Sequence, residues 1–160
     1  MTYYTRMESP VGELLLTADD KALTGIYFDD GRDHHVIEDD WKERATLPVL
    51  KDARQQLEEY FAGRREEFDL PLAPKGTPFQ RRVWKALERI PYGETQSYGE
   101  IARKIGKPKA VRAVGAANGA NPLSVVVPCH RVIGTDGSLT GYGGGLPRKR
   151  ALLALEHRAE

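Results

Sequence analysis

The single cysteine of this 160-residue chain, Cys129, is followed directly by His130. A thiol attacks carbon as the thiolate, and a neighbouring imidazole can take its proton. The apolar run Val125–Val127 leads into Pro128 just before the thiol, a pattern that predicts a short buried strand or extended segment ending at the cysteine. A lone cysteine is more often a small buried apolar residue than a nucleophile. The flanking sequence must therefore decide between these two interpretations.

Charge is divided unevenly along the chain. Residues 1–76 carry 10 Lys and Arg against 17 Asp and Glu, a net charge of −7, whereas residues 77–160 carry 14 against 6, a net charge of +8. A small basic half is typical of nucleic-acid binding, although it would also suit docking on an acidic lobe. There is no apolar run of membrane-spanning length and no signal peptide. One cysteine excludes an internal disulfide, and the free thiol suits a reducing cytoplasm.

The first half of the chain predicts an acidic α/β lobe, residues 1–72, that acts as a scaffold. Turn residues separate three short β-prone runs, which predict a small antiparallel meander. These runs are residues 3–7, 14–17 and 23–28. Residues 29–40 are acidic and predict a loop. From Pro48 the apolar residues follow a helical spacing, and Gly63 is a good stop for that helix.

Residues 77–160 predict a mostly helical, basic domain, so the whole chain is expected to be an α+β protein. Thr77 is a good N-cap and Pro78 a good first residue of a helix. Farther along, a short helix ends at Gly106, a tight turn follows, and a second helix begins, which is a helix-turn-helix pattern. A last helix is expected over residues 148–157, packed through its leucines.

The second helix of the helix-turn-helix is rich in alanine and glycine around one long side chain, Arg112. A helix that reads bases in the major groove needs long polar side chains. Small residues instead let a backbone approach the minor groove closely. The same residues would also suit a tightly packed core helix, but Arg112 in their midst favours DNA.

The sequence around the cysteine resembles one family. Pro128-Cys129-His130-Arg131-Val132 follows Asn121-Pro122 and the Arg112 helix, and precedes Gly141-Tyr142-Gly143-Gly144-Gly145 and Leu153-Ala154-Leu155-Glu156. In order and spacing, residues 77–160 are similar to the O6-alkylguanine-DNA alkyltransferases, also called methylated-DNA–protein-cysteine methyltransferases. The resemblance implies direct repair without a cofactor. A flipped O6-alkylguanine, and also O4-alkylthymine, would pass its alkyl group irreversibly to Cys129.

The resemblance also implies catalytic roles, residue by residue. Cys129 would be the nucleophile, and His130 would be the base that deprotonates it through a water. Glu156 would orient the imidazole. Asn121 would be the hinge that ties the recognition helix to the active-site strand. Tyr98 would crowd the 3′ phosphate and donate a proton to the guanine.

Other positions are expected to bind substrate or DNA. Arg112 resembles the finger that replaces the flipped base in the stack. Tyr142 and the Gly143 N–H resemble groups of a loop that holds the lesion, and the Val132 carbonyl resembles an acceptor for the guanine amine. The remaining expected contacts are Gly99, Lys107, Thr135 and Gly144. The implied partner is double-stranded DNA, bound through the minor groove by a monomer.

Some features depart from the family pattern or leave alternatives open. Some relatives hold zinc in the first lobe, but this chain lacks the cysteines for such a site, so no metal is expected. Ser124 and Gly143 stand where some relatives have proline and serine, which predicts a slimmer, more flexible pocket. One alternative is a Cys-His-Glu hydrolase that turns over on esters or amides. The other is a regulator that binds DNA without chemistry and is indifferent to Cys129→Ser.

Overall fold

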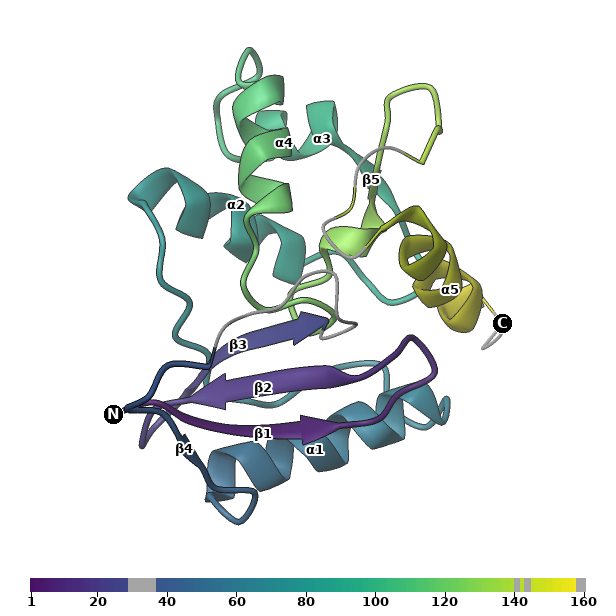
Figure 1. Cartoon of the computed structure of the whole chain (residues 1–160). Coiled ribbons are helices and arrows are strands. Elements are labelled where there is room, and N and C mark those ends of the chain that lie inside the picture. The colour runs from purple at the N-terminus through teal and green to yellow at the C-terminus, as the bar shows by residue number, and fades with distance from the viewer. Residues whose placement is uncertain (29–36, 140–141, 143–144, 158–160) are drawn as a thin grey trace. The chain divides into compact units, whose positions relative to one another are not determined.

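The computed structural model describes residues 1–28, 37–139, 142 and 145–157. The chain falls into two compact units, Met1–Pro74 and Lys75–Glu160 (Figure 1). No helix in the described ranges is both long and apolar enough to cross a membrane.

The first unit is a four-stranded sheet with one helix. Its elements are β1 (Tyr3–Met7), β2 (Leu14–Ala18), β3 (Leu23–Phe28), β4 (Lys42–Glu43) and α1 (Pro48–Phe61). The strand order is β3-β2-β1-β4, with β2 antiparallel to both β1 and β3. The predicted meander is therefore confirmed. The sequence did not predict β4, a two-residue exposed strand parallel to β1, because it carries no apolar signature.

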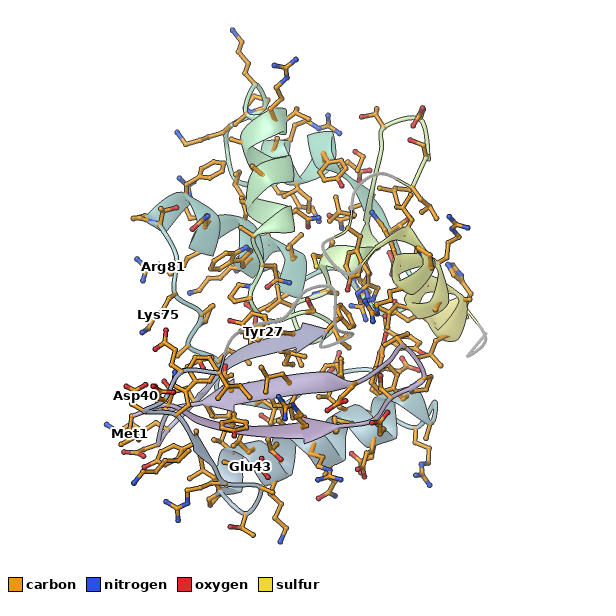
Figure 2. All side chains as sticks on the ribbon, viewed as in Figure 1. Met1, Tyr27, Asp40, Glu43, Lys75 and Arg81 are labelled. Atoms are coloured by element: carbon orange, nitrogen blue, oxygen red, sulfur yellow. The ribbon has the colours of Figure 1, made fainter. Side chains whose placement is uncertain are left out.

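Helix α1 packs against β1, β2 and β3, as its apolar spacing predicts. Leu50, Ala53, Leu57 and Tyr60 lie three or four residues apart and are fully buried. Gly63, with φ of +77°, reverses the chain just after the helix. Figure 2 labels Tyr27 on β3 and Glu43 on β4, the two edge strands of the sheet.

The second unit is mostly helical, as predicted. Its elements are α2 (Pro78–Glu88), β5 (Gln96–Ser97), α3 (Tyr98–Lys104), α4 (Val111–Gly119), the 3-10 turn η1 (Cys129–Arg131), β6 (Val132–Ile133) and α5 (Leu146–His157). Helices α2, α3 and α4 pack on one another, and α3 with α4 forms the expected helix-turn-helix. Thr77 caps α2 with a reciprocal bond to Gln80, and Ser97 caps α3 in the same way with Glu100.

Two short elements that the sequence did not predict tie the helix-turn-helix to the cysteine. Strand β5 pairs in parallel with β6, so that Gln96 lies opposite Val132 and Ser97 opposite Ile133. Tyr98 follows β5 directly, and Cys129 lies three residues before β6. The first residue of α3 is therefore linked through this ladder to the residues that follow the thiol. Two-residue strands are too short to show an alternating pattern.

The prediction of a strand or extended segment over Val125–Val127 was wrong. The three valines are buried, as their composition predicts, but the chain turns at this point and forms no strand. Val125 has a φ of +73°, which reverses the chain direction instead of extending it. An apolar run reports burial more reliably than it reports backbone conformation.

Candidate active site

Cys129 opens the η1 turn and is only 4% exposed. Burial raises the pKa of its thiol, while a hydrogen bond from Asn121 and the charge of Lys149 act in the opposite direction. The resting group is therefore the neutral thiol. It needs a base at the moment of reaction, because only the thiolate is a good nucleophile.

His130, the residue after the thiol, forms a buried pair with Glu156 of α5. His130 Nε2 lies 2.6 Å from Glu156 Oε2, and both side chains are 0% exposed. Burial lowers the pKa of His130, although Glu156 partly offsets this effect. The ring is therefore neutral near pH 7. Since an ionised carboxylate only accepts hydrogen bonds, Nε2 carries the ring proton and Nδ1 is the basic nitrogen.

The other ring nitrogen of His130 makes no hydrogen bond that the structure records. His130 Nδ1 is buried and has no hydrogen-bond partner among the described residues. Buried polar atoms are nearly always paired, so an orphan acceptor at this position requires a functional explanation.

Arg131, the residue after the histidine, holds the other edge of Glu156. Its Nε donates to Glu156 Oε1 at 2.8 Å and its Nη2 donates to Oε2 at 3.0 Å, while Nη1 donates to the Ile90 carbonyl at 2.7 Å. Burial alone would raise the pKa of Glu156, but the hydrogen bonds from His130 and Arg131 bring it down to about 2. The carboxylate is thus ionised at neutral pH and fixed in direction.

Lys149 of α5 is a fully buried cation. Its Nζ donates to the Val132 carbonyl at 2.6 Å, and its charge lowers the pKa of Cys129. The Val132 carbonyl was predicted from the resemblance to accept from the guanine amine. A carbonyl oxygen has two lone pairs, so the bond from Lys149 does not by itself exclude that contact.

Asparagine side chains connect α4 and its C-terminal end to the cysteine segment. Asn121 Nδ2 donates to the Val127 carbonyl at 2.8 Å, and its Oδ1 accepts from the Leu123 N–H at 3.0 Å. Asn118, on α4 itself, donates to the Cys129 carbonyl at 3.4 Å. Asn121 thus bonds to the segment that leads to the thiol, and Asn118 adds a second link that the sequence did not reveal.

Only part of the expected lesion loop lies within the described residues. The Tyr142 hydroxyl is buried, and burial together with the charge of Cys129 raises its pKa well above the ordinary value. It therefore remains a neutral group near the thiol. Gly143 and Gly144 lie outside the described residues.

The exposed face of α4 carries the expected DNA-binding residues. Arg112, Ala113, Ala116 and Gly119 are all exposed, whereas Val114 and Ala117 face the core. Tight core packing therefore explains Ala117 but not the small residues of the outer face. Lys107, in the turn before α4, is also exposed.

The remaining predicted positions lie at the start of α3 and in the turn after β6. The ring of Tyr98 lies against α4, because a Cβ at Gly115 would be 3.9 Å from two of its carbons. Gly99 follows it in α3 and is half-buried, and Thr135 is exposed in the turn that the Gly134 N–H and Ser138 carbonyl close. The structure thus brings His130 and Glu156 together, whereas the exposed Arg112, Lys107 and Thr135 have no polar contact with that pair.

Comparison with known proteins identifies the family. Residues 78–158 match the DNA-binding domain of 6-O-methylguanine DNA methyltransferase, and residues 2–74 match its ribonuclease-like domain. The chain belongs to the 6-O-methylguanine DNA methyltransferase family. The resemblance predicted from the sequence is confirmed.

Individual members of this family are similar over nearly the whole chain. The methylated-DNA–protein-cysteine methyltransferase of Methanosarcina acetivorans is 52% identical over 154 residues, which cover 96% of this chain and 97% of that protein. The constitutive one of Bacillus subtilis is 50% identical and covers 96% and 93%. The crystal structure of Mycobacterium tuberculosis OGT in complex with DNA has a TM-score of 0.89 at 50% identity and covers 98% and 94%.

The sequence analysis gave no role to two charged residues of the candidate active site, Arg131 and Lys149. Arg131 was visible in the motif around the cysteine, but nothing in a linear sequence shows that it shares Glu156 with His130. Lys149 lies seven residues before Glu156 in the sequence, which is two turns along the same face of α5. That spacing is the signal that could have identified it.

Proposed function

We propose that this protein repairs O6-alkylguanine in DNA by transferring the alkyl group to Cys129, once per molecule. The observation that carries this proposal is a buried thiol followed in the sequence by a buried imidazole, whose Nε2 is held by an ionised carboxylate and whose Nδ1 has no partner among the described residues. This arrangement suits removal of a proton from a thiol in a low-dielectric site. The same displacement would act on O4-alkylthymine.

The proposed reaction is a displacement at saturated carbon. The proton of Cys129 passes through a water to His130 Nδ1, and Sγ attacks the alkyl carbon bonded to the guanine O6. The carbon–oxygen bond breaks as the carbon–sulfur bond forms, and the departing guanine takes a proton, for which the Tyr98 hydroxyl is the proposed donor. The resulting thioether has no good leaving group. The protein therefore reacts a single time.

We propose that α4 and the residues around it bind the duplex. The target atom is buried in stacked DNA, so the base must flip out. The small exposed residues of α4 would let the helix enter the minor groove as a monomer, with Arg112 filling the vacated position. Gly99, Lys107, Thr135 and the loop residues Tyr142, Gly143 and Gly144 are the further proposed contacts. The free thiol needs a reducing compartment, and we place the activity in the cytoplasm.

The two alternative functions have less support. A hydrolase would turn over repeatedly, and a regulator would have no use for the thiol. The relatives at about half identity carry the name of methyltransferases that act on methylated DNA through a protein cysteine. The buried charge around Cys129 is also unexplained in a protein that only binds DNA.

Stoichiometry tests the proposed function. Protein incubated with an excess of duplex containing O6-methylguanine should gain one methyl group, located on Cys129 by peptide mass mapping, and then stop. Cys129→Ser should bind the duplex and gain none. Repair of more than one equivalent of O6-methylguanine per protein would contradict the single-use mechanism, and a methyl group on any other residue would contradict the assignment of Cys129.

A further inference from the structure

The segment before the nucleophile contains two three-residue turns of opposite hand. The Val126 N–H donates to the Ser124 carbonyl at 2.9 Å around Val125, whose φ is +73°. The Cys129 N–H donates to the Val127 carbonyl at 2.8 Å around Pro128, with φ of −80° and ψ of +65°. The second turn is the common inverse γ-turn, whereas a γ-turn with positive φ is rare and strained.

Val125 is an unusual residue for the strained turn. It is the one non-glycine residue with positive φ in the described part of the chain. A β-branched side chain at positive φ is a genuine conformational outlier. The chain uses glycine at six other described positions with positive φ, including Gly63 and Gly106, yet it places valine here.

The surroundings hold Val125 in this conformation. The Val127 N–H donates to the Leu123 carbonyl at 2.9 Å, a bond that encloses the strained turn. The Asn121 side chain forms hydrogen bonds with both ends of the same segment, accepting from the Leu123 N–H and donating to the Val127 carbonyl. The Val125 side chain is itself buried, with 1% exposed. Strain of this kind persists only where neighbouring contacts over-determine the backbone, and it gathers at functional sites.

We propose that Val125 is a positioning residue for alkyl transfer. A residue with a Cβ is confined to a narrow range of backbone angles at positive φ, so Val125 holds the strained turn in one conformation. The turn thereby fixes the direction in which Pro128 and Cys129 present Sγ. Glycine at this position would relieve the strain but leave a hinge four residues before the nucleophile. The proposal rests on the proposed role of Cys129, since Val125 acts only through it. Displacement requires Sγ in line with the carbon–oxygen bond, and a small misplacement slows such a reaction strongly.

The test compares Val125→Ala with Val125→Gly. Alanine removes most of the side chain and keeps much of the penalty for positive φ, whereas glycine removes that penalty. At ordinary positions glycine is less stable than alanine. We expect the reverse here, with a higher Tm for Val125→Gly. We also expect its single-turnover rate on methylated duplex to be at least about tenfold lower than that of Val125→Ala, at equal affinity for the duplex.

The neighbouring residue provides a matched control. Val126 is also a buried valine, but its φ is not positive. Val126→Gly should therefore have a lower Tm than Val126→Ala, which is the ordinary order.

Two results would overturn the proposal. A lower Tm for Val125→Gly than for Val125→Ala would show that the turn stores no strain. Equal transfer rates for these two variants would show that the turn does not position the thiol. The Tm comparison needs no reaction, so it still tests the strained turn if Cys129 of the parent protein proves not to be the alkyl acceptor.

Discussion

The two units bury different kinds of polar side chain. In the described part of the first unit the buried polar residues are Thr5, Thr17 and Gln56, none of which is charged. The corresponding residues in the second unit are Asn118, His130, Arg131, Lys149 and Glu156. Buried charge is costly and contributes little to stability compared with apolar packing. The second unit buries these charged side chains close to Cys129, and such clusters of buried charge are typical of functional sites.

Arginine–carboxylate pairs occur in both units and make the contrast concrete. Arg65 Nε lies 2.8 Å from Glu59 Oε1 in the first unit, and both side chains are about one-third exposed. Arg131 Nε lies at the same distance from Glu156 Oε1, and that carboxylate is fully buried. The distances are equal, so burial is what distinguishes the surface pair of the first unit from the pair at the candidate active site.

The largest predicted effect is that of Glu156→Gln. This change leaves Arg131 as a buried cation without its carboxylate, which should lower the free energy of unfolding by about 3–5 kcal/mol. It also removes the group that orients His130, so transfer to Cys129 should be slower by roughly 10²-fold or more. Single-turnover rates, corrected for the folded fraction, measure this effect. Duplex affinity should barely change.

Glu59→Gln is the matched control in the first unit. Its single-turnover rate should equal that of the parent, and its Tm should be nearly unchanged because the pair lies at the surface, where solvent weakens the attraction between the charges. If both glutamine variants lost rate equally, or if Glu156→Gln reacted at the parent rate, the contrast between the units would be wrong.

Arg112→Ala tests an exposed residue of the second unit against the buried pair of His130 and Glu156. Arg112 is the proposed finger, so its loss should slow repair of duplex DNA strongly, since base extrusion costs a few kcal/mol. It should leave the reaction with the free base O6-benzylguanine nearly intact, provided that the pocket admits it. Single-turnover rates on both substrates measure the difference.

Lys107→Ala serves as the control for Arg112→Ala. As a proposed phosphate contact, Lys107 should contribute to binding of any duplex, so its loss should weaken binding uniformly and reduce the salt dependence. Equal losses on duplex and free base for Arg112→Ala would instead assign Arg112 to the pocket or the fold.

Much of the fold was predictable because its signals are local. The Thr77 and Pro78 start of α2, the helical spacing from Leu50 to Tyr60 and the turn at Gly106 each depend on neighbouring residues. The two-residue strands β4, β5 and β6 were missed, because their pairing depends on segments far apart in sequence.

The site was predictable in its residue types but not in its electrostatics. Cys129 and His130 are visible as neighbours, whereas the sharing of Glu156 between His130 and Arg131 depends on the way α5 packs on η1. The leucines of α5 suggested an apolar buried face. The structure buries Lys149, Leu152 and Glu156 and leaves Leu153 and Leu155 only partly covered. The reversed backbone at Val125 has no local signature, because valine favours the opposite conformation.

The pH dependence of stability sets the window for a kinetic test. The pKa of Glu156 falls from 4.5 to about 2 in the folded protein, so its stabilising contribution is present above pH 4.5 and is lost as the pH falls towards 2. His130 is buried as the neutral form and has a lowered pKa. The unfolded chain therefore takes up its proton first, and stability also declines as the pH falls below about 6.5.

The most direct test of the central claim is the pH profile of single-turnover methyl transfer in the parent and in Glu156→Gln, corrected for the folded fraction. If neutral His130 is the base for the buried thiol, the parent rate should fall on acidification only below the ordinary histidine pKa of about 6.5. Glu156 raises the pKa of His130, so the acid limb of Glu156→Gln should lie at lower pH than that of the parent, at a lower maximal rate. An acid limb that lies at the same pH in both proteins would contradict the assignment of His130 and Glu156 as the base and its orienting carboxylate.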